Sequence, residues 1–360
     1  MKDSELTRLR HRIRKTDETL VEVLNERSRL SIDIGKIKKR RHMEVYDPAK
    51  EAAIYRHLDE INVGPLPRRE LHHIFREIIS SSRSLQAPVS VACLGPEASF
   101  THLAARHHFG ETALFVSLPT ISDVFDRVER KQASCGVVPV ENSLEGSVNM
   151  TLDHLHTTPL TIRAEILLPI RHCLLSAAAK IRPLKHIYSH PQALAQCQHW
   201  LTTHLPRCTR HAMESTAVAV QKVAGDRESA AIGSREAATH YGLNVLFEGI
   251  EDYHTNVTRF IVIGEGLSAR TGNDKTSILF GTRHEPGALF HALEPFAKKK
   301  INLVRIESHP IKGTMWEYLF FADCTGSFTD RTVRSCLAAL KKKTTFFKIL
   351  GSYPAGEIPA

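Results

Sequence analysis

The apolar residues between positions 6 and 41 recur with a period of seven. Such spacing is typical of one face of a helix that packs against another helix. A helix of roughly 36 residues is about 54 Å long and is not stable alone in water, so we expect a second helix or a second chain against it. The two heptad series are Ile13, Leu20, Arg27 and Ile34, and Leu9, Thr16, Val23, Leu30 and Ile37.

Two shorter helices are predicted after this one. Asp47-Pro48 marks a helix start, because aspartate is a favoured N-cap and proline is favoured at the first helical position. We expect this helix to end near Asn62 and a third to run from about Arg68 to about Leu85. Since this part shows almost no strand pattern, residues 1–87 are predicted to form a small all-α domain.

After residue 87 the pattern changes to short apolar runs that alternate with helical segments. Examples are "VSVACLGPEASFTHLAARHHF", "ASCGVVPVENS" and "RFIVIGEG". This alternation predicts an α/β domain of two lobes over residues 88–267. Over residues 274–355 the order becomes βαββαβ, with middle strands expected in "INLVRIESHPI" and "WEYLFFADCTG". That order predicts a ferredoxin-like unit.

The composition is that of an ordinary globular protein, with 42% hydrophobic and 24% charged residues. The sequence has no run of 18 apolar residues, and its start, "MKDSELTRLR", lacks the apolar core of a secretory signal. We therefore predict no membrane span and a cytoplasmic location. The seven cysteines show no CxxC and no framework spacing, which favours reduced thiols.

The net charge of +9 is distributed unevenly, with basic first and last parts and a slightly acidic middle. Basic ends are compatible with nucleic-acid binding. However, the runs Lys298–Lys300 and Lys341–Lys343 each end a predicted helix, where the helix dipole favours cations. We interpret these charges as solvated helix faces and predict no nucleic-acid partner.

Arg27 is unexpected on the apolar seam, because a buried unpaired guanidinium is costly. An ion pair with Glu26 or Asp33 of a neighbouring chain, or a side chain that extends to water, would explain it structurally. Lys38, 11 positions further on, lies near the same helix face. Two acids lie four positions apart at the start of the second predicted helix, and two neutral donors lie four positions apart on the third. Together with the two cations they favour a polar ligand pocket. The acids and neutral donors are Asp47, Glu51, Ser82 and Gln86.

Three segments of this part resemble the all-helical chorismate mutase family: "LRHRIRKTDETLVEVLNERSRLSIDIGKIK", "VYDPAKE" and "FREIISSSRSLQ". Arg10 and Lys38 are about 42 Å apart on one helix, so the resemblance implies that Arg10 comes from a second chain, as in the interlocked dimer of the family. Lys50 stands where close relatives often carry arginine. The active-site residues implied are Arg10, Arg27, Lys38, Asp47, Glu51, Ser82 and Gln86.

The resemblance also implies the reaction. Chorismate carries two carboxylates, and its rearrangement to prephenate is unimolecular, so it needs neither a general base nor a metal. Catalysis comes from holding the reactive conformer and stabilising charge on the ether oxygen, with Lys38 and Gln86 as donors. Asp47 and Glu51 would hold the ring hydroxyl, although Asp47 is also explained as a plain N-cap.

Five segments of the middle part, "GPEASFTHLAA", "VPVENSLEGSV", "SHPQALAQC", "MESTAVAV" and "NVTRF", together resemble the prephenate dehydratase family. That reaction expels a hydroxyl as water and a carboxylate as CO₂, leaving phenylpyruvate. The resemblance makes Thr258 the proton donor, in a dry and preorganised site, and Arg259 a carboxylate anchor. The other substrate-binding residues implied are Ser99, Thr101, Glu141, Asn142, Ser143, Ser189, His190, Gln192, Ser215, Thr216 and Phe260.

Two features of this part need separate comment. Ala98 stands where the family loop usually has glycine, and it would be strained if that position requires a positive φ. His190 is compatible with a metal ligand or a base, but none of the 21 histidines has companions at convincing metal-site spacing. We predict no metal and no cofactor.

The last part resembles a phenylalanine-responsive ACT domain through "GALFHAL" and "ESHP". The resemblance implies that two such domains pair, bind L-phenylalanine at their interface and lower the dehydratase activity. An ACT fold that only dimerises is the alternative. His309 replaces the arginine usual in the family. The effector-binding residues implied are Gly287, Ala288, Leu289, Glu307, Ser308, His309 and Pro310.

Two other classes of protein share parts of this pattern. A transcriptional regulator would need short helices joined by a tight turn, whereas one pattern here continues for about 36 residues. A two-lobed solute-binding protein would need export, and no signal segment is present. Neither explains Arg27, Lys38, Glu51 and Gln86 together. We therefore predict an enzyme with both activities, acting on chorismate and prephenate as a homodimer or higher homo-oligomer.

Overall fold

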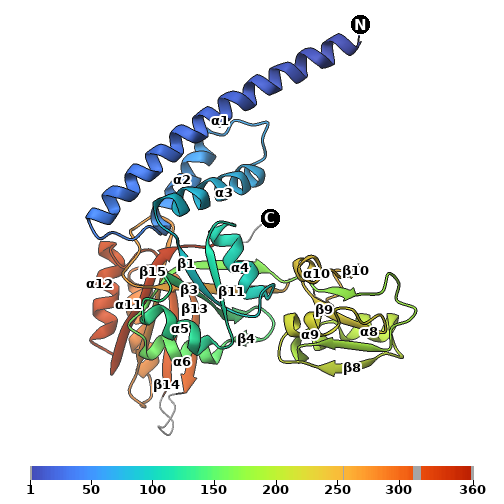
Figure 1. Ribbon diagram of the computed structural model, residues 1–360. Helices are drawn as coiled ribbons and strands as arrows, with labels where there is room; N and C mark the ends of the chain where they lie inside the picture. Colours follow the sequence, from blue (N-terminus) through green and yellow to red (C-terminus); the bar gives the residue numbers. More distant parts are fainter. Residues whose placement is uncertain (1, 254, 311–317, 358–360) are drawn as a thin grey trace.

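The computed structural model describes residues 2–253, 255–310 and 318–357 of the 360-residue chain. Three parts follow one another along the chain: a helical part, a two-lobed α/β part and a second α/β unit (Figure 1). Ile311, Trp316 and Glu317, at the ends of two predicted strands, lie outside the described residues.

The helical part consists of α1 (Lys2–Arg40), α2 (Pro48–Ile61) and α3 (Arg68–Gln86). Asp47 caps α2 as expected, since its carboxylate accepts a hydrogen bond from the backbone N–H of Lys50 at 3.1 Å. α1 packs on α3 only near its C-terminal end, and its N-terminal half extends beyond the other two helices (Figure 1). Gly35 permits this contact, because a Cβ there would lie 2.8 Å from Cα of Gln86.

The first lobe is built on a sheet in the order β2-β1-β3-β11-β5, with β4 paired to β3. β11 returns from the far side of the second lobe and runs antiparallel between β3 and β5. The strands are β1 (Ser90–Leu94), β2 (Leu114–Leu118), β3 (Cys135–Asn142), β4 (Gly146–Ser147), β5 (Thr161–Pro169) and β11 (Val257–Gly264), and the helices are α4 (Phe100–Phe109), α5 (Ile121–Glu129) and α6 (Asn149–Thr157).

The second lobe carries its own sheet in the order β10-β6-β9-β7-β8. Its core of Leu174, Ile187, Leu201 and Ile232 is separate from that of the first lobe. The strands are β6 (Cys173–Ser176), β7 (His186–Ser189), β8 (Thr209–Ala212), β9 (Ser229–Gly233) and β10 (Asn244–Glu248), and the helices are α7 (Pro191–Gln196), α8 (Gln198–His204), α9 (Thr216–Lys222) and α10 (Arg235–Tyr241).

The C-terminal unit has the predicted βαββαβ order, with its sheet arranged β13-β14-β12-β15. One face of this sheet packs on its own helices, while Leu279, Phe321 and Tyr353 on the other face share a core with the first lobe. The elements are β12 (Asp274–Gly281), α11 (Ala288–Lys298), β13 (Leu303–Pro310), β14 (Tyr318–Thr325), α12 (Arg331–Lys341) and β15 (Phe346–Pro354).

The predicted fold class is confirmed in each of the three parts. All seven cysteines are free thiols, as expected. Within residues 2–253, 255–310 and 318–357, no helix combines the length and apolar character needed to cross a membrane, and no cluster of histidine, cysteine or acidic side chains has a metal-binding arrangement.

Candidate active sites

The first site lies where the C-terminal part of α1 faces α3 and the start of α2. Arg27 on α1 donates a hydrogen bond through Nη1 to Oγ of Ser82 on α3. Lys38 Nζ donates to the carbonyl of Val45 at 2.9 Å, and burial lowers the pKa of Lys38. Arg27 therefore has a polar partner inside the bundle, as the unusual seam position required.

Glu51 is the buried acid of this site. Its carboxylate is 15% exposed and forms an ion pair of 3.1 Å with Arg83, which is 7% exposed. Burial raises the pKa of Glu51 to about 7, against the opposing pull of Arg83 and Lys38. The carboxylate is thus poised between its two protonation states near neutral pH.

Gln86 ends α3 beside Gly35, and its Oε1 is a buried acceptor without a partner among the described residues. Such an atom is rare in folded proteins and indicates a place for a ligand donor or a water. Arg10 is brought together with none of these groups, since it lies about 42 Å from Lys38 along the same helix. The residues that one chain does bring together are Arg27, Lys38, Asp47, Glu51, Ser82 and Gln86.

The second site is a cavity of ≈ 260 Å³ between the two lobes. It is formed by strand ends and by the starts of α4, α7 and α9, whose N-caps are Ser99, His190 and Ser215. Helix starts present backbone N–H groups and a positive dipole, which suit carboxylates. The predicted residues that line the cavity are Ser99, Thr101, Asn142, His190, Gln192, Ser215, Thr216 and Thr258.

The side-chain amide of Asn142 holds Thr258, and the hydrogen bonds of that amide fix which of its ends faces Thr258. Asn142 Oδ1 accepts hydrogen bonds from the backbone N–H groups of Leu144 and Glu145, at 3.0 and 3.2 Å. Its Nδ2 must therefore face Thr258, and it donates to Thr258 Oγ1 at 2.8 Å. Because the hydroxyl oxygen already accepts this bond, the hydroxyl hydrogen remains available to donate into the cavity.

Four further polar residues of the cavity were missed from the sequence: Asn256, Gln196, His172 and Glu214. Asn142 Nδ2 also donates to Asn256 Oδ1 at 2.7 Å, and Asn256 Nδ2 donates to Gln196 Oε1 at 3.0 Å. Gln196 Oε1 also contacts His172 Nε2 at 3.0 Å, which assigns the ring proton to that nitrogen. The period of two along a strand places residues 256 and 258 on one face and was the available signal.

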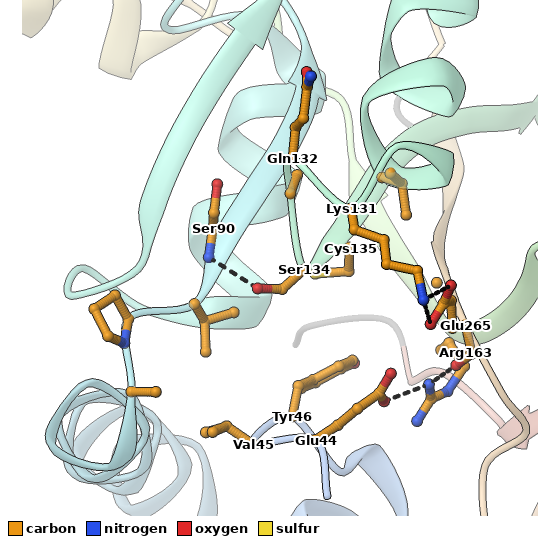
Figure 2. Close-up of a pocket in the computed structure, with 16 residues that line it drawn as sticks. Glu44, Val45, Tyr46, Ser90, Lys131, Gln132, Ser134, Cys135, Arg163 and Glu265 are labelled. Carbon is orange, nitrogen blue, oxygen red and sulfur yellow. Dashed lines mark hydrogen bonds and ion pairs between the residues drawn. The ribbon is translucent and has the colours of Figure 1, made fainter. Parts of the chain in front are cut away.

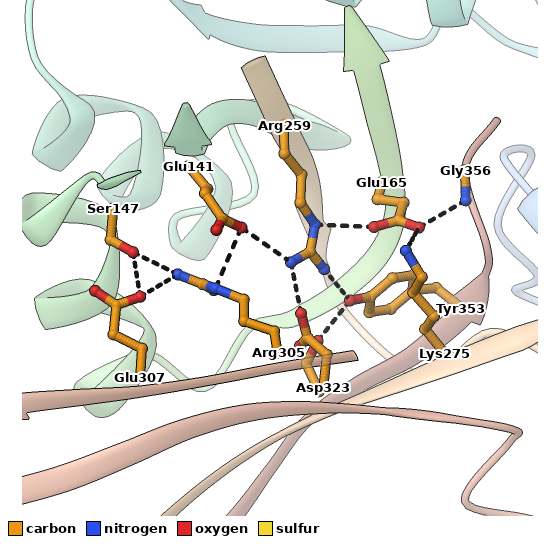
Figure 3. A network of polar contacts seen from close by, with 11 residues as sticks. Glu141, Ser147, Glu165, Arg259, Lys275, Arg305, Glu307, Asp323, Tyr353 and Gly356 are labelled. Carbon is orange, nitrogen blue, oxygen red and sulfur yellow. Dashed lines mark hydrogen bonds and ion pairs between the residues drawn. The ribbon is translucent and has the colours of Figure 1, made fainter. Parts of the chain in front are cut away.

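Five predicted substrate-binding residues do not line the cavity. Ser189 Oγ is buried and donates to the carbonyl of Ile232, and Phe260 lies in the core of the first lobe. Ser143 Oγ donates to the carbonyl of Thr255. The other two, Glu141 and Arg259, point to the opposite face of the sheet, toward the C-terminal unit (Figure 3).

Arg259 is fully engaged on that opposite face. Its guanidinium contacts Glu165 at 2.8 Å, Asp323 at 2.5 Å and the Tyr353 hydroxyl at 2.8 Å (Figure 3). Since this geometry does not bring Arg259 to the cavity, it favours a structural role, and the expected carboxylate anchor is missing there. Among the described residues that line the cavity there is no lysine or arginine, so the helix starts are the positive groups available to a substrate carboxylate.

The effector residues predicted in the C-terminal unit lie at one end of its sheet. Gly287 has a φ of +81° and begins α11, which places Ala288 and Leu289 in the first turn. The other four, Glu307, Ser308, His309 and Pro310, end strand β13. Their side chains divide between the two faces: His309 Nε2 contacts Asp153 of α6 at 2.8 Å, whereas Ser308 is exposed.

Another cavity, of ≈ 360 Å³, lies where the helical part meets the first lobe (Figure 2). Arg163 Nη1 donates to Glu44 at 2.8 Å, and Lys131 pairs with Glu265 at 2.9 Å. Because both cations already have acidic partners, this cavity offers an anion little attraction. Its contacts instead attach the segment before α2 to the dehydratase-like lobe.

Comparison with family models gives the same three parts. The chorismate mutase type II model matches residues 9–87, the prephenate dehydratase model residues 91–267 and the ACT domain model residues 276–342. Fold and site geometry therefore define a multidomain enzyme with a mutase, a dehydratase and an ACT part.

Similar proteins and structures agree with this class. The bifunctional chorismate mutase/prephenate dehydratase of Aquifex aeolicus (strain VF5) is 45% identical over 97% of this chain and 98% of its own length. A prephenate dehydratase from Arthrobacter aurescens, solved in complex with L-Phe, has a TM-score of 0.70 and 36% identity, covering 74% of this chain and 90% of that chain. The prephenate dehydratase of Staphylococcus aureus subsp. aureus Mu50 has a TM-score of 0.65 and 29% identity, covering 74% and 100%.

The chain belongs to the bifunctional chorismate mutase/prephenate dehydratase family. It is an isomerase and a lyase of phenylalanine biosynthesis.

Proposed function

We propose that the helical part rearranges chorismate at the site formed by Arg27, Lys38, Glu51 and Gln86. The observation that carries this proposal is the convergence of two cations, a buried carboxylate and an unpartnered amide oxygen inside one bundle. Lys38 and the Gln86 amide nitrogen would donate to the ether oxygen as its bond breaks. Glu51 would accept a hydrogen bond from the ring hydroxyl.

Dehydration takes place in the cavity between the lobes. The Thr258 hydroxyl donates its proton to the leaving hydroxyl, which departs as water, and Thr258 takes up a proton from solvent before the next turnover. The electron pair of the broken bond to the CO₂ carbon completes the aromatic ring. Asn142 holds the Thr258 oxygen, and the helix starts capped by Ser99 and Ser215 bind carboxylate.

A homodimer would complete the mutase site. The α1 seam is exposed in the single chain, with Ile13 at 62% and Leu20 at 55%. Exposed apolar residues in a row along a helix indicate a contact with another helix. A second α1 packed there would supply Arg10 to the site at the opposite end. We place the functional units at residues 1–87, 88–267 and 274–355, and the reduced thiols favour the cytoplasm.

Feedback inhibition by L-phenylalanine is supported by contacts of the predicted effector strand. Glu307 pairs with Arg305 at 2.5 Å, and Arg305 also contacts Glu141 at 3.2 Å (Figure 3). Glu141 precedes Asn142, which holds Thr258. A ligand that binds differently to two arrangements of β13 would therefore act on the dehydratase site through Arg305.

The test is a time course with chorismate alone in buffer containing EDTA and no cofactor, in which chorismate, prephenate and phenylpyruvate are separated by chromatography. Accumulation of phenylpyruvate above the uncatalysed background is expected. Prephenate alone would contradict the dehydratase assignment, and unchanged chorismate would contradict the mutase assignment.

Two variants separate the sites. Arg27→Ala should abolish the mutase reaction and leave dehydration of supplied prephenate nearly intact. Thr258→Val should do the reverse, with a loss of about 10²- to 10⁴-fold, as expected when a general acid is removed. Equal loss of both activities in either variant would indicate unfolding and not a site effect.

A further inference from the structure

Arg83 is a buried cation of α3 that the sequence analysis did not select. Its Nη1 lies 3.1 and 3.4 Å from the two carboxylate oxygens of Glu51. Its Nη2 donates to the carbonyl of Phe109 at 2.5 Å. The guanidinium carbon also lies 5.2 Å from the centre of the Phe109 ring and 5.8 Å from that of Tyr46. One side chain thus joins the acid of the mutase site to the dehydratase domain.

We propose that Arg83 is a positioning residue of the mutase reaction: it holds the Glu51 carboxylate in place and favours its ionised form, and it is itself fixed by the dehydratase domain. The proposal rests on the assignment of Glu51 to the mutase site. Arg83 acts through Glu51 and is not expected to touch the substrate.

The electrostatic surroundings make Arg83 the direct partner of Glu51. Lys38 on α1 also lowers the pKa of Glu51, but Asp47 raises it, and burial raises it more than any of these charges. No other ion pair to Glu51 occurs among the described residues. Three uncharged groups lie nearby: burial raises the pKa of Tyr46, raises that of Tyr55 to about 12 and lowers that of His108 to about 3. The other ionisable residues that line the same pocket as Glu51 form no ion pair with it in the described part of the chain; they are His72, His73, Arg76, His107, Glu165 and Glu357.

The dehydratase domain fixes the other end of Arg83. Phe109 is the last residue of α4, where free carbonyls and the negative end of the helix dipole attract a cation. The Tyr46 hydroxyl contacts His108 Nε2 at 2.7 Å and so holds the segment before α2 against the same helix end. The mutase carboxylate is therefore oriented by a guanidinium whose geometry depends on α4, which packs against α3 (Figure 1).

The test compares Arg83→Gln, Arg83→Lys and the intact enzyme by the pH dependence of mutase kcat/KM. Loss of an adjacent positive charge changes the pKa of a carboxyl group by about 1–3 units. The acidic limb of Arg83→Gln should therefore move upward by at least about one pH unit, with at least about a fivefold loss at pH 7 that shrinks as pH rises. Arg83→Lys keeps the charge and should keep the limb near its original pH.

The matched control is Arg69→Gln, which removes an exposed arginine near the start of the same helix, away from Glu51. This variant should keep the mutase pH profile. Dehydration of supplied prephenate and the melting temperature, measured for every variant, separate a local effect from unfolding. If Arg83→Gln fails to fold, the mutase pH profiles of Arg83→Lys and Glu51→Gln are compared instead. The proposal expects an acidic limb in Arg83→Lys and the loss of that limb in Glu51→Gln, and a limb that persists in Glu51→Gln would overturn it.

A double substitution identifies the route of the effect. In a Glu51→Gln background, Arg83→Gln should cost little further mutase activity, because the group it positions is already changed. Two results would overturn the proposal. One is a loss of mutase kcat/KM in the double variant equal to the product of the losses in the two single variants, and the other is an acidic limb of Arg83→Gln at the pH of the intact enzyme. Absence of mutase activity in the intact enzyme would instead contradict the proposed function itself.

Discussion

Thr258 and Arg259 are neighbours in the chain but face opposite sides of one strand. Thr258 Oγ1 accepts from Asn142 at the cavity, whereas Arg259 is surrounded by Glu165, Asp323 and Tyr353. The motif "NVTRF" therefore contains two functions, one for each face. Strand alternation predicts this separation, and applied to the sequence it would have favoured Asn256 over Arg259 as a cavity residue.

Ala98 has the positive φ, +60°, that the sequence analysis associated with strain. Its methyl group is 7% exposed and packs with Cys173 and Leu175 of the second lobe, so the position is both strained and buried. The strain costs roughly 1–2 kcal/mol for a residue with a Cβ. Burial of one methyl group returns about 0.8 kcal/mol.

We expect Ala98→Gly to change the free energy of unfolding by less than about 1 kcal/mol, because relief of strain offsets the lost methyl contact and the greater freedom of the unfolded chain. Ala98→Val should destabilise by more than about 2 kcal/mol, since a β-branched residue fits this φ poorly. Denaturant titration measures both. A Val variant as stable as the natural protein would contradict this account.

Strands β3 and β11 present Asn142 and Thr258 to the cavity on one face and contact the ACT part on the other. Their register pairs Thr258 with Asn142, and Arg259 with Glu141. The two pairs are adjacent, so we expect a shift of the Arg259–Glu141 pair to move the Thr258–Asn142 pair as well. The order of helices and strands was predictable from periodicity, but this juxtaposition was not, because it depends on how two domains pack.

Arg305→Gln tests this connection at the level of the strands. The intact enzyme should lose dehydratase activity as L-phenylalanine is added. The variant should retain that activity but need at least about tenfold more phenylalanine for half-inhibition, equivalent to about 1.4 kcal/mol of coupling. Arg334→Gln on the exposed face of α12 is the control and should behave as the intact enzyme. Equal inhibition of all three proteins would exclude Arg305 from the route.

At the scale of the whole molecule, the long first helix exposes an apolar seam that nothing in the described part of a single chain covers. The heptad pattern predicted α1 and its need for a partner, and the structure confirms the helix with most of its seam exposed. Arg10 belongs by its number to the N-terminal half of α1, and this half extends away from the other helices (Figure 1). The sequence therefore predicts that Arg10 acts in the site of a second chain. The residues that Arg10 would contact there belong to that second chain, so a single chain does not show them.

A charge on the α1 seam should separate the chains. Ile13→Asp is expected to lower the molar mass measured by light scattering and to reduce mutase activity, while dehydration of supplied prephenate persists. Lys15→Asp, two residues away and off the seam, introduces the same side chain and should change neither property. An Ile13→Asp enzyme with unchanged mass and mutase activity would argue against pairing through α1.

Helix α4 begins at the dehydratase cavity with Ser99 and Thr101 and ends at the mutase site with the carbonyl of Phe109. A single helix of ten residues therefore contributes to both candidate sites, one at each of its ends. Cutting the chain after residue 87 would leave the freed mutase with an arginine that has lost its carbonyl. The carboxylate of one site is thus oriented through a helix that belongs to the next domain, so this domain boundary is not a neutral place to divide the chain.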